Sequence, residues 1–146
     1  MRILVVDDNQ DLAFTMATLL RTWGHQVSTA HDGEAALVAA ERLDPEVIFL
    51  DLGLPGMDGY EVARRIRQTD SGKTIRLVAV TGSDGSQDFV GAKDARIDLH
   101  ITKPVEARQL ISLLAAAPAS ALQRASMTGS FPWPRPTVNG GRPVSF

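Results

Sequence analysis

The sequence predicts an α/β fold in which a five-stranded parallel sheet is doubly wound, with helices on both of its faces. Two observations predict it. Short apolar runs rich in β-branched residues alternate five times with longer segments of helical periodicity. Four of these five runs also lead directly into an acidic, hydroxyl or basic side chain. Ligands of such sheets bind beyond the carboxyl ends of the strands, so this pattern indicates a polar site at one edge.

The predicted strands are four or five residues long and largely apolar. They span residues 3–6, 26–30, 47–50, 77–80 and 99–102. The runs Ile3-Leu4-Val5-Val6 and Val47-Ile48-Phe49-Leu50 contain no polar residue, which is typical of strands buried on both faces. Because parallel neighbours need crossover connections, a helix is expected after each strand.

Helices are expected from Asp11 to the stop signal at Gly24, and over residues 33–43, 59–68, 86–95 and 105–117. The fourth carries Gly91 in its interior, which weakens it. Spacing of apolar residues predicts which side chains face the sheet. The predicted inward residues are Leu12, Met16, Leu19, Leu20 and Trp23 in the first helix, Leu37, Val38 and Leu43 in the second, Val62, Ala63 and Ile66 in the third, and Leu110, Ile111, Leu113 and Leu114 in the last.

Composition divides the 146 residues into one globular domain, residues 1–117, and a tail, residues 118–146. The tail holds five of the eight prolines and is expected to be largely disordered. Its segment Phe131-Pro132-Trp133-Pro134 is either a docking peptide of polyproline type or part of a plain flexible tail. The chain has no cysteine, no signal peptide and no apolar run approaching the roughly 20 residues of a membrane span, so a cytoplasmic protein is expected.

Three acids, Asp7, Asp8 and Asp51, follow two predicted strands and should converge in one pocket. Three close carboxylates cannot all stay ionised unless a cation lies among them. Oxygen ligands without cysteine or clustered histidine point to Mg²⁺, with Mn²⁺ as an alternative. The backbone carbonyl of Gly53, two residues beyond Asp51, is the expected additional ligand.

Lys103 brings a positive charge to the end of the last predicted strand, and Thr81 brings a hydroxyl to the end of the fourth. The Lys103-Pro104 bond is expected to be cis. An anionic nucleophile, a metal ion, an ammonium and a hydroxyl form a site suited to a transferring phosphoryl group, with Asp51 as the acceptor.

The stretches ILVVDDNQD, VIFLDLGLPGMDGYEVARRIR, AVTGSDG and ITKPVEARQL together resemble the receiver domains of two-component response regulators, which have a flavodoxin-like (βα)5 fold. The spacing agrees, with 30 positions from Asp51 to Thr81 and 22 from Thr81 to Lys103. The resemblance covers about residues 2–117 and extends to receivers associated with hybrid histidine kinases.

The resemblance implies that Asp51 accepts a phosphoryl group from a sensor histidine kinase or histidine phosphotransfer protein. Asp7 and Asp8 would bind Mg²⁺, and Thr81 and His100 would form a switch pair. The expected protein is a stand-alone signalling module and not an enzyme, with a fragment of a larger hybrid kinase as the alternative. It would act on an output protein, without binding nucleic acid or membrane, as a monomer or weak homodimer. One departure from the family is Arg96, where receivers usually have a glycine that forms a left-handed turn.

Other interpretations remain for these residues. Asp7 and Asp8 could cap the first helix, although Asn9 or Asp11 could do so as well. His100 could be a half-buried core residue. A small phosphatase or phosphotransferase with Asp51 as nucleophile would need an acid two residues later, where Gly53 lies, and a cap segment. A nucleotide or flavin module would need a glycine-rich loop, which DDNQDLA lacks.

Overall fold

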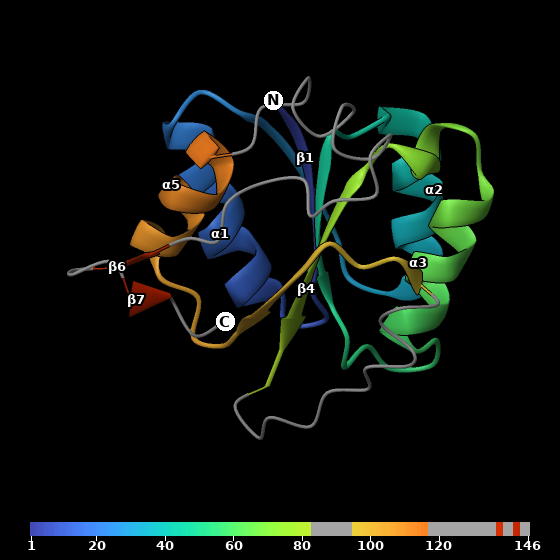
Figure 1. Cartoon of the computed structure of the whole chain (residues 1–146). Coiled ribbons are helices and arrows are strands. Elements are labelled where there is room, and N and C mark those ends of the chain that lie inside the picture. The colour runs from blue at the N-terminus through green and yellow to red at the C-terminus, as the bar shows by residue number, and fades with distance from the viewer. Residues whose placement is uncertain (83–94, 117–136, 139–141, 144–146) are drawn as a thin grey trace.

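A computed structural model describes residues 1–82, 95–116, 137–138 and 142–143 of the chain. Five parallel strands form one sheet in the order β2-β1-β3-β4-β5. The strands are β1 (Arg2–Val6), β2 (Gln26–Ala30), β3 (Val47–Asp51), β4 (Arg76–Thr81) and β5 (Leu99–Thr102). The helices with described bounds are α1 (Gln10–Thr22), α2 (Gly33–Leu43), α3 (Gly59–Gln68) and α5 (Ala107–Ala116). Figure 1 shows α1 and α5 on one face of the sheet and α2 and α3 on the other.

The doubly wound sheet is as predicted, and β2, α2, α3 and β5 have the predicted bounds. Asp51 and Thr81 prove to be the last residues of β3 and β4 instead of the first residues beyond them. A short 3-10 helix (Ser71–Lys73) before β4 was not predicted. The predicted helix 86–95 lies outside the described residues except for Ala95, which is helical. The Lys103-Pro104 bond is cis, as expected.

The strands are buried because each face of the sheet packs against its own layer of helices. Along β1, Ile3 and Val5 join the apolar cluster under α1 and α5. Leu4 and Val6 alternate with them and join the cluster under α2 and α3. A strand that must satisfy two apolar layers has no solvent-facing side, which explains its unbroken apolar sequence.

Three side chains cap the helices that start near the polar edge of the sheet. Asn9 accepts hydrogen bonds from the backbone N–H groups of Asp11 and Leu12 at the start of α1. Asp32 caps α2 and Asp58 caps α3 in the same manner. Asn9 therefore does the capping that was considered for Asp7 and Asp8, and both acids remain available for a site.

The inward faces of three helices differ in part from the prediction. Alanines are prominent among the buried residues of α1 and α2, namely Ala13, Ala17, Ala36 and Ala40. Of the predicted inward residues, Leu20 is buried, and Met16, Leu19, Trp23 and Leu37 pack partly buried against the core. Other predicted inward residues are instead exposed, namely Leu12 (48%), Val38 (55%), Leu43 (39%) and Ile111 of α5 (51%). The predicted face of α3 is correct, with Val62, Ala63 and Ile66 buried.

The tail is described only at Thr137–Val138 (β6) and Arg142–Pro143 (β7), which pair in antiparallel fashion. The predicted disorder of the tail stays a prediction, and the docking peptide 131–134 lies outside the described residues. Among the residues that the structure describes, no helix is both long and apolar enough to cross a membrane.

Candidate functional site

The sheet order brings the predicted acids together. Strands β1 and β3 are neighbours, and Val6 stands opposite Leu50 in their register. Asp7 follows Val6 and Asp51 follows Leu50, so the two acids lie side by side at the same edge of the sheet. One carboxylate oxygen from each of Asp7, Asp8 and Asp51 lies within 4.8 Å of the others. Asp7 and Asp51 are buried, whereas Asp8 is exposed.

Lys103 supplies the positive charge that this cluster requires. Its Nζ lies 3.2 Å from Asp7 Oδ2 and 3.3 Å from Asp51 Oδ2. Burial alone would lower the pKa of Lys103, but Asp51 and Asp7 together raise it above its ordinary value. The side chain is therefore a fixed ammonium at neutral pH, and it joins the first, third and fifth strands of the sheet.

Backbone groups hold two of the acids in place. Asp7 Oδ1 accepts a hydrogen bond from the N–H of Asn9, and Asp51 Oδ1 accepts one from the N–H of Gly53, both at 2.9 Å. His31, for which no role was predicted, lies with its Nδ1 3.1 Å from the carbonyl oxygen of Asp7. Only its place just after the second predicted strand could have suggested this contact.

Gly59 allows the start of α3 to approach the acceptor strand closely. A Cβ atom at this position would lie 2.6 Å from Leu52 Cα and 2.9 Å from the carbonyl oxygen of Asp51. Any side chain there would push α3 away from Asp51, so the glycine brings the capped helix against the site.

The donor set fits a hard divalent cation. Three carboxylates facing one ammonium leave two uncompensated negative charges, which one divalent ion would balance. All-oxygen ligands suit Mg²⁺ or Mn²⁺. The predicted ligands Asp7, Asp8 and Asp51 are thus brought together. Gly53 lines the same cleft, although the contact that the structure gives it is through its N–H.

Thr81 shares this cleft, which has a volume of about 810 Å³ and is also lined by Asp8, Asp51, Gly53 and Lys103. The Thr81 hydroxyl lies 3.5 Å from the carbonyl oxygen of Ile101 in the adjacent strand β5, at the limit of a hydrogen bond. So weak a contact leaves the hydroxyl free to rotate toward another acceptor in the cleft.

His100 does not line the cleft. It stands opposite Ala79 in the β4–β5 register and is half-buried. Its Nε2 is buried and has no hydrogen-bond partner among the described residues. Burial lowers the pKa of His100 below its ordinary value. The half-buried position agrees with a core histidine as well as with a switch residue, so the predicted switch role stays a prediction.

Stability is expected to fall as the pH drops below about 6.5, the ordinary pKa of histidine. The unfolded chain binds a proton at His100 more readily than the folded protein does. The contribution of neutral His100 to stability is therefore fully present above that pH, and it is lost as the pH falls toward the lowered pKa of the folded state. His25, whose pKa is lowered first by burial and then by the N-terminal ammonium, adds to the slope. Urea unfolding between pH 8 and 5 should give a shallower slope for His100→Phe than for the wild type. An unchanged slope would contradict this prediction.

Arg96 adopts the left-handed conformation, with φ of +53°. This residue keeps the turn that glycine usually forms and accepts the strain. The exposed Arg96 side chain projects from the turn that leads into β5.

Comparison with known proteins agrees with this geometry. A family model described as response regulator receiver domain matches residues 3–115. The sensory transduction protein RegX3 of Mycobacterium tuberculosis is 36% identical over 114 residues, which cover 78% of this chain and 49% of RegX3. The DNA-binding response regulator MtrA of Mycobacterium tuberculosis is 35% identical over 146 residues, covering 95% of this chain and 63% of MtrA.

Solved structures include a receiver domain with a metal ion. The receiver domain of the sensor histidine kinase PA1611 from Pseudomonas aeruginosa, with a magnesium ion coordinated in its active site cleft, has a TM-score of 0.70 and 29% identity. The match covers 84% of this chain and 94% of that domain. The chain spans about half the length of RegX3, so the comparisons concern the part that carries the acid cluster.

Proposed function

Because the chain belongs to the response regulator receiver family, whose members accept a phosphoryl group on an aspartate in two-component signalling, we propose that Asp51 is the acceptor here. One observation carries the proposal. Asp51 is a buried carboxylate at the end of a central strand, with two further acids and the ammonium of Lys103 around it. Three acids gathered around one ammonium are only partly compensated, and burying uncompensated charge costs free energy, so the cluster points to a functional role.

The donor is a phosphohistidine on a sensor histidine kinase or a histidine phosphotransfer protein, the partners of this family. A carboxylate oxygen of Asp51 bonds to phosphorus while the bond between phosphorus and the imidazole nitrogen breaks, and the imidazole leaves. Lys103 stabilises the charge on the phosphoryl oxygens, and Thr81 can donate its hydroxyl to one of them. Asp7 and Asp8 would hold Mg²⁺, which adds positive charge beside those oxygens when bound.

Phosphorylation is proposed to act on an output protein through Thr81 and His100. The new group carries a charge of about −1.5 to −2 and favours rotation of the Thr81 hydroxyl toward it. Movement at Thr81 can reach His100 because β4 and β5 are paired from Val78–Leu99 to Thr81–Thr102. Receivers are signalling modules of this kind and not classical enzymes.

Partner contact is favoured by exposed apolar side chains at the start of α1. Phe14 is 67% exposed and Leu12 is 48% exposed. Leu12 lines a pocket together with Asp7 and Lys103, so a protein that covers the start of α1 also approaches the acceptor. We propose that this contact is made in the cytoplasm and by a monomer or weak homodimer.

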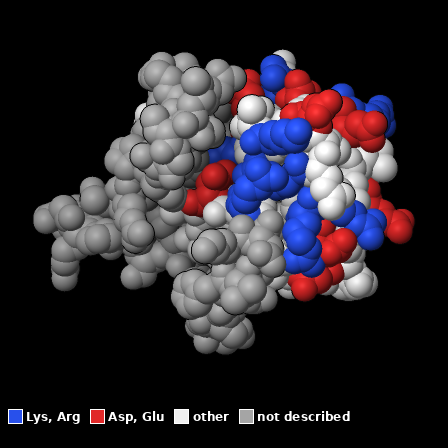
Figure 2. Space-filling view, turned by 45° about the vertical axis from the view of Figure 1, so that its right-hand side comes forward, with Lys and Arg blue, Asp and Glu red and all other residues white. Residues whose placement is uncertain are grey.

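Nucleic-acid binding, which the name of MtrA gives that protein, is not proposed for the receiver itself. The net charge of the chain is −2. Figure 2 shows basic and acidic side chains interspersed over the helical face that it presents, without a uniform basic field. On α3, Glu61 is paired with both Arg64 and Arg65. This mixed face and the small negative net charge therefore do not favour binding of a polyanion.

A metabolite phosphatase with an aspartate nucleophile is the other candidate. It needs an acid two residues after the nucleophile, where this chain has Gly53. The Gly53 N–H instead holds Asp51 Oδ1. No described feature favours this alternative over the receiver function.

Intact-mass analysis after incubation with acetyl phosphate and Mg²⁺ tests the proposal. One phosphoryl group should be added per chain, and EDTA should prevent the addition because the acids lose their divalent counter-ion. Magnesium restored after EDTA should restore the modification. A folded protein that remains unmodified with the donor and Mg²⁺ would contradict the proposed function.

A further inference from the structure

Arg67, near the end of α3, uses all five of its N–H donors inside the protein. Its side chain is 6% exposed. Nε donates to the carbonyl oxygen of Arg96 at 3.2 Å, and Nη2 donates to the same oxygen at 2.7 Å. Nη1 donates to the carbonyl oxygens of Gly72, at 2.7 Å, and Ile75. The last donor, on Nη2, reaches Asp98 Oδ2 at 3.0 Å. One guanidinium therefore joins α3, the entry to β4 and the turn before β5.

Asp98 connects this guanidinium to strand β4. Its Oδ2 also accepts a hydrogen bond from the backbone N–H of Leu77, at 2.9 Å. Its own N–H donates to the carbonyl oxygen of Leu77, also at 2.9 Å. Burial raises the pKa of Asp98, while the charges of Arg67 and Arg76 favour the ionised carboxylate. Asp98 is the residue immediately before β5, so the start of that strand is fixed to β4 and α3 together.

Strand β5 needs such a fixed start. It is an edge strand with a single neighbour, and only four residue pairs align it with β4. Beyond its other end, the N–H of Lys103 donates to the carbonyl oxygen of Thr81 at 2.8 Å. A shift of one residue along a strand reverses the facing of every side chain. Whatever holds the start of β5 therefore also decides where Lys103 lies.

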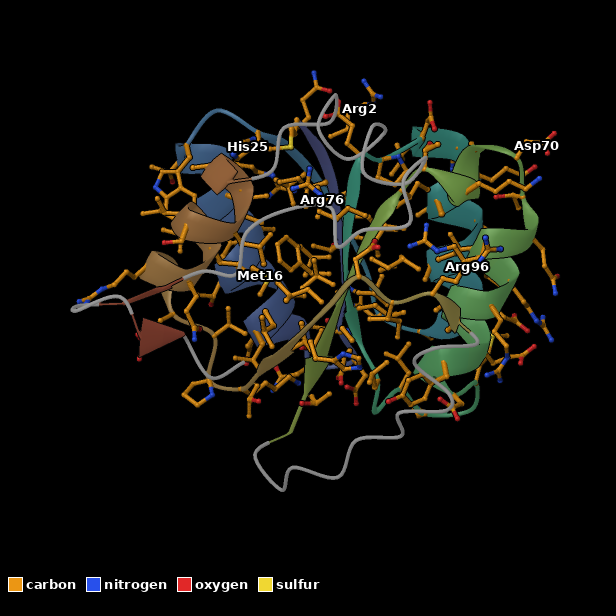
Figure 3. All side chains as sticks on the ribbon, in the orientation of Figure 1. Arg2, Met16, His25, Asp70, Arg76 and Arg96 are labelled. Atoms are coloured by element: carbon orange, nitrogen blue, oxygen red, sulfur yellow. The ribbon has the colours of Figure 1, made fainter. Side chains whose placement is uncertain are left out.

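The turn before β5 adds a second sign of constraint. Arg96 holds a left-handed conformation, which is strained for a residue other than glycine. Arg67 donates two of its hydrogen bonds to the carbonyl of this residue. Figure 3 shows Arg96 on the side of the sheet that α3 covers. The strained turn is thus held by the same guanidinium that binds Asp98.

We propose that Arg67 and Asp98 are positioning residues for phosphoryl transfer, fixing the start of β5 against β4 so that Lys103 reaches Asp7 and Asp51. The inference rests on the proposed function, since it assigns these residues to the same reaction. A buried ion pair often adds little net stability compared with apolar residues of similar size. Its value here is the placement of an edge strand whose far end carries the ammonium of the site.

Two substitutions of Asp98 in the full chain separate positioning from stability. Asp98→Ala removes both acceptor contacts, whereas Asp98→Asn keeps an oxygen that can accept from Leu77 and Arg67. With acetyl phosphate as the donor, Asp98→Ala should slow phosphorylation at saturating donor and Mg²⁺ by about tenfold, because misplacing a reacting group by about 1 Å can cost up to a hundredfold. Asp98→Asn should recover most of the rate. Mg²⁺ affinity should stay within about twofold for both variants, since the acids lie on other strands.

Arg67→Lys should resemble Asp98→Ala, because one ammonium cannot replace a fork of five donors. Val27→Ala provides the matched control. Val27 is a buried residue of β2, the opposite edge strand, so its truncation lowers stability without touching β5. This variant should be phosphorylated at the wild-type rate. Hydrogen exchange should be faster at the β5 amides in Asp98→Ala and unchanged there in Val27→Ala.

Asp98→Ala with a wild-type rate, or Val27→Ala slowed by the same factor, would overturn the inference and leave the proposed function standing. A wild-type protein that binds Mg²⁺ yet takes up no phosphoryl group would overturn the proposed function and the inference with it. The wild-type measurement therefore tells the two failures apart.

Discussion

Replacing Asp51 with asparagine is expected to abolish phosphorylation by acetyl phosphate and Mg²⁺. A side-chain amide at this position cannot act as the nucleophile, and no other described acid combines burial at the end of a central strand with contact to Lys103 in the same cleft as Thr81. The variant should fold with a free energy of unfolding within about 1 kcal/mol of wild type, because relief of acid repulsion offsets the lost contact with Lys103. Intact mass and urea unfolding measure the two effects.

Asp58→Asn is the matched control for this substitution. Asp58 lines the same cleft and caps α3, and asparagine caps a helix as well as aspartate does. The same chemical change elsewhere in the cleft should therefore leave phosphorylation intact. Phosphoryl uptake by Asp51→Asn, or its loss in Asp58→Asn, would contradict the assignment of Asp51 as the acceptor.

Replacing Lys103 with methionine should have the second largest effect, and it should lower both the phosphorylation rate and the stability. Loss of a charged donor to the transferring group should slow phosphorylation by about a hundredfold, as when one donor is removed from an oxyanion site. Without Mg²⁺ the protein should also lose about 2 kcal/mol of stability, because partly buried acids are left without their ammonium. Added Mg²⁺ should restore this stability, since it binds the same carboxylates.

A time course of phosphorylation measures the rate, and thermal unfolding with and without Mg²⁺ measures the stability. Lys73→Met serves as the control, because its side chain is 58% exposed and its contact, with Asp70, is at the surface. This variant should match the wild type in both assays. If Lys103→Met kept the wild-type rate, or lost no stability in the absence of Mg²⁺, the role assigned to Lys103 would be wrong.

The strands and the acid cluster could be predicted because their signals are local. A central parallel strand must be apolar on both sides, so an acid at its end, such as Asp51, stands out in the sequence. The alternation of strands and helices then fixes which edge of the sheet these ends share. Asp7, Asp8, Thr81 and Lys103 could all be placed at one site by this argument.

Helix faces were harder to predict because hydrophobicity alone does not say how closely a helix approaches the sheet. Ala13 and Ala17 lie against the sheet in α1, while Leu12 is half exposed. Small residues permit close contact of helix and sheet, and larger apolar residues then lie at the flanks of the interface. The predicted face of α2 is wrong at Val38 and Leu43 for the same reason, with Ala36 buried instead, whereas Leu37 packs partly buried against the core as predicted.

The Arg67–Asp98 pair could not be predicted from any pattern. An arginine after apolar Ile66 in an amphipathic helix suggests a solvent-facing side chain. Four of its five acceptor contacts are to main-chain carbonyls, which every residue possesses and no motif marks. Only the assembled fold brings the guanidinium beside Asp98, 31 positions later.

The position of Lys103 in the chain has a consequence for synthesis on the ribosome. The nearest of the three acids in sequence, Asp51, precedes this lysine by 52 positions. When β4 has left the exit tunnel, the complete acid cluster is therefore outside as well, while the lysine that neutralises it is still inside the tunnel. The last strand of the five-stranded sheet to emerge, β5, completes one edge of that sheet and is followed directly by the missing positive charge. Cotranslational folding of this domain is thus completed only after residue 103 has left the exit tunnel.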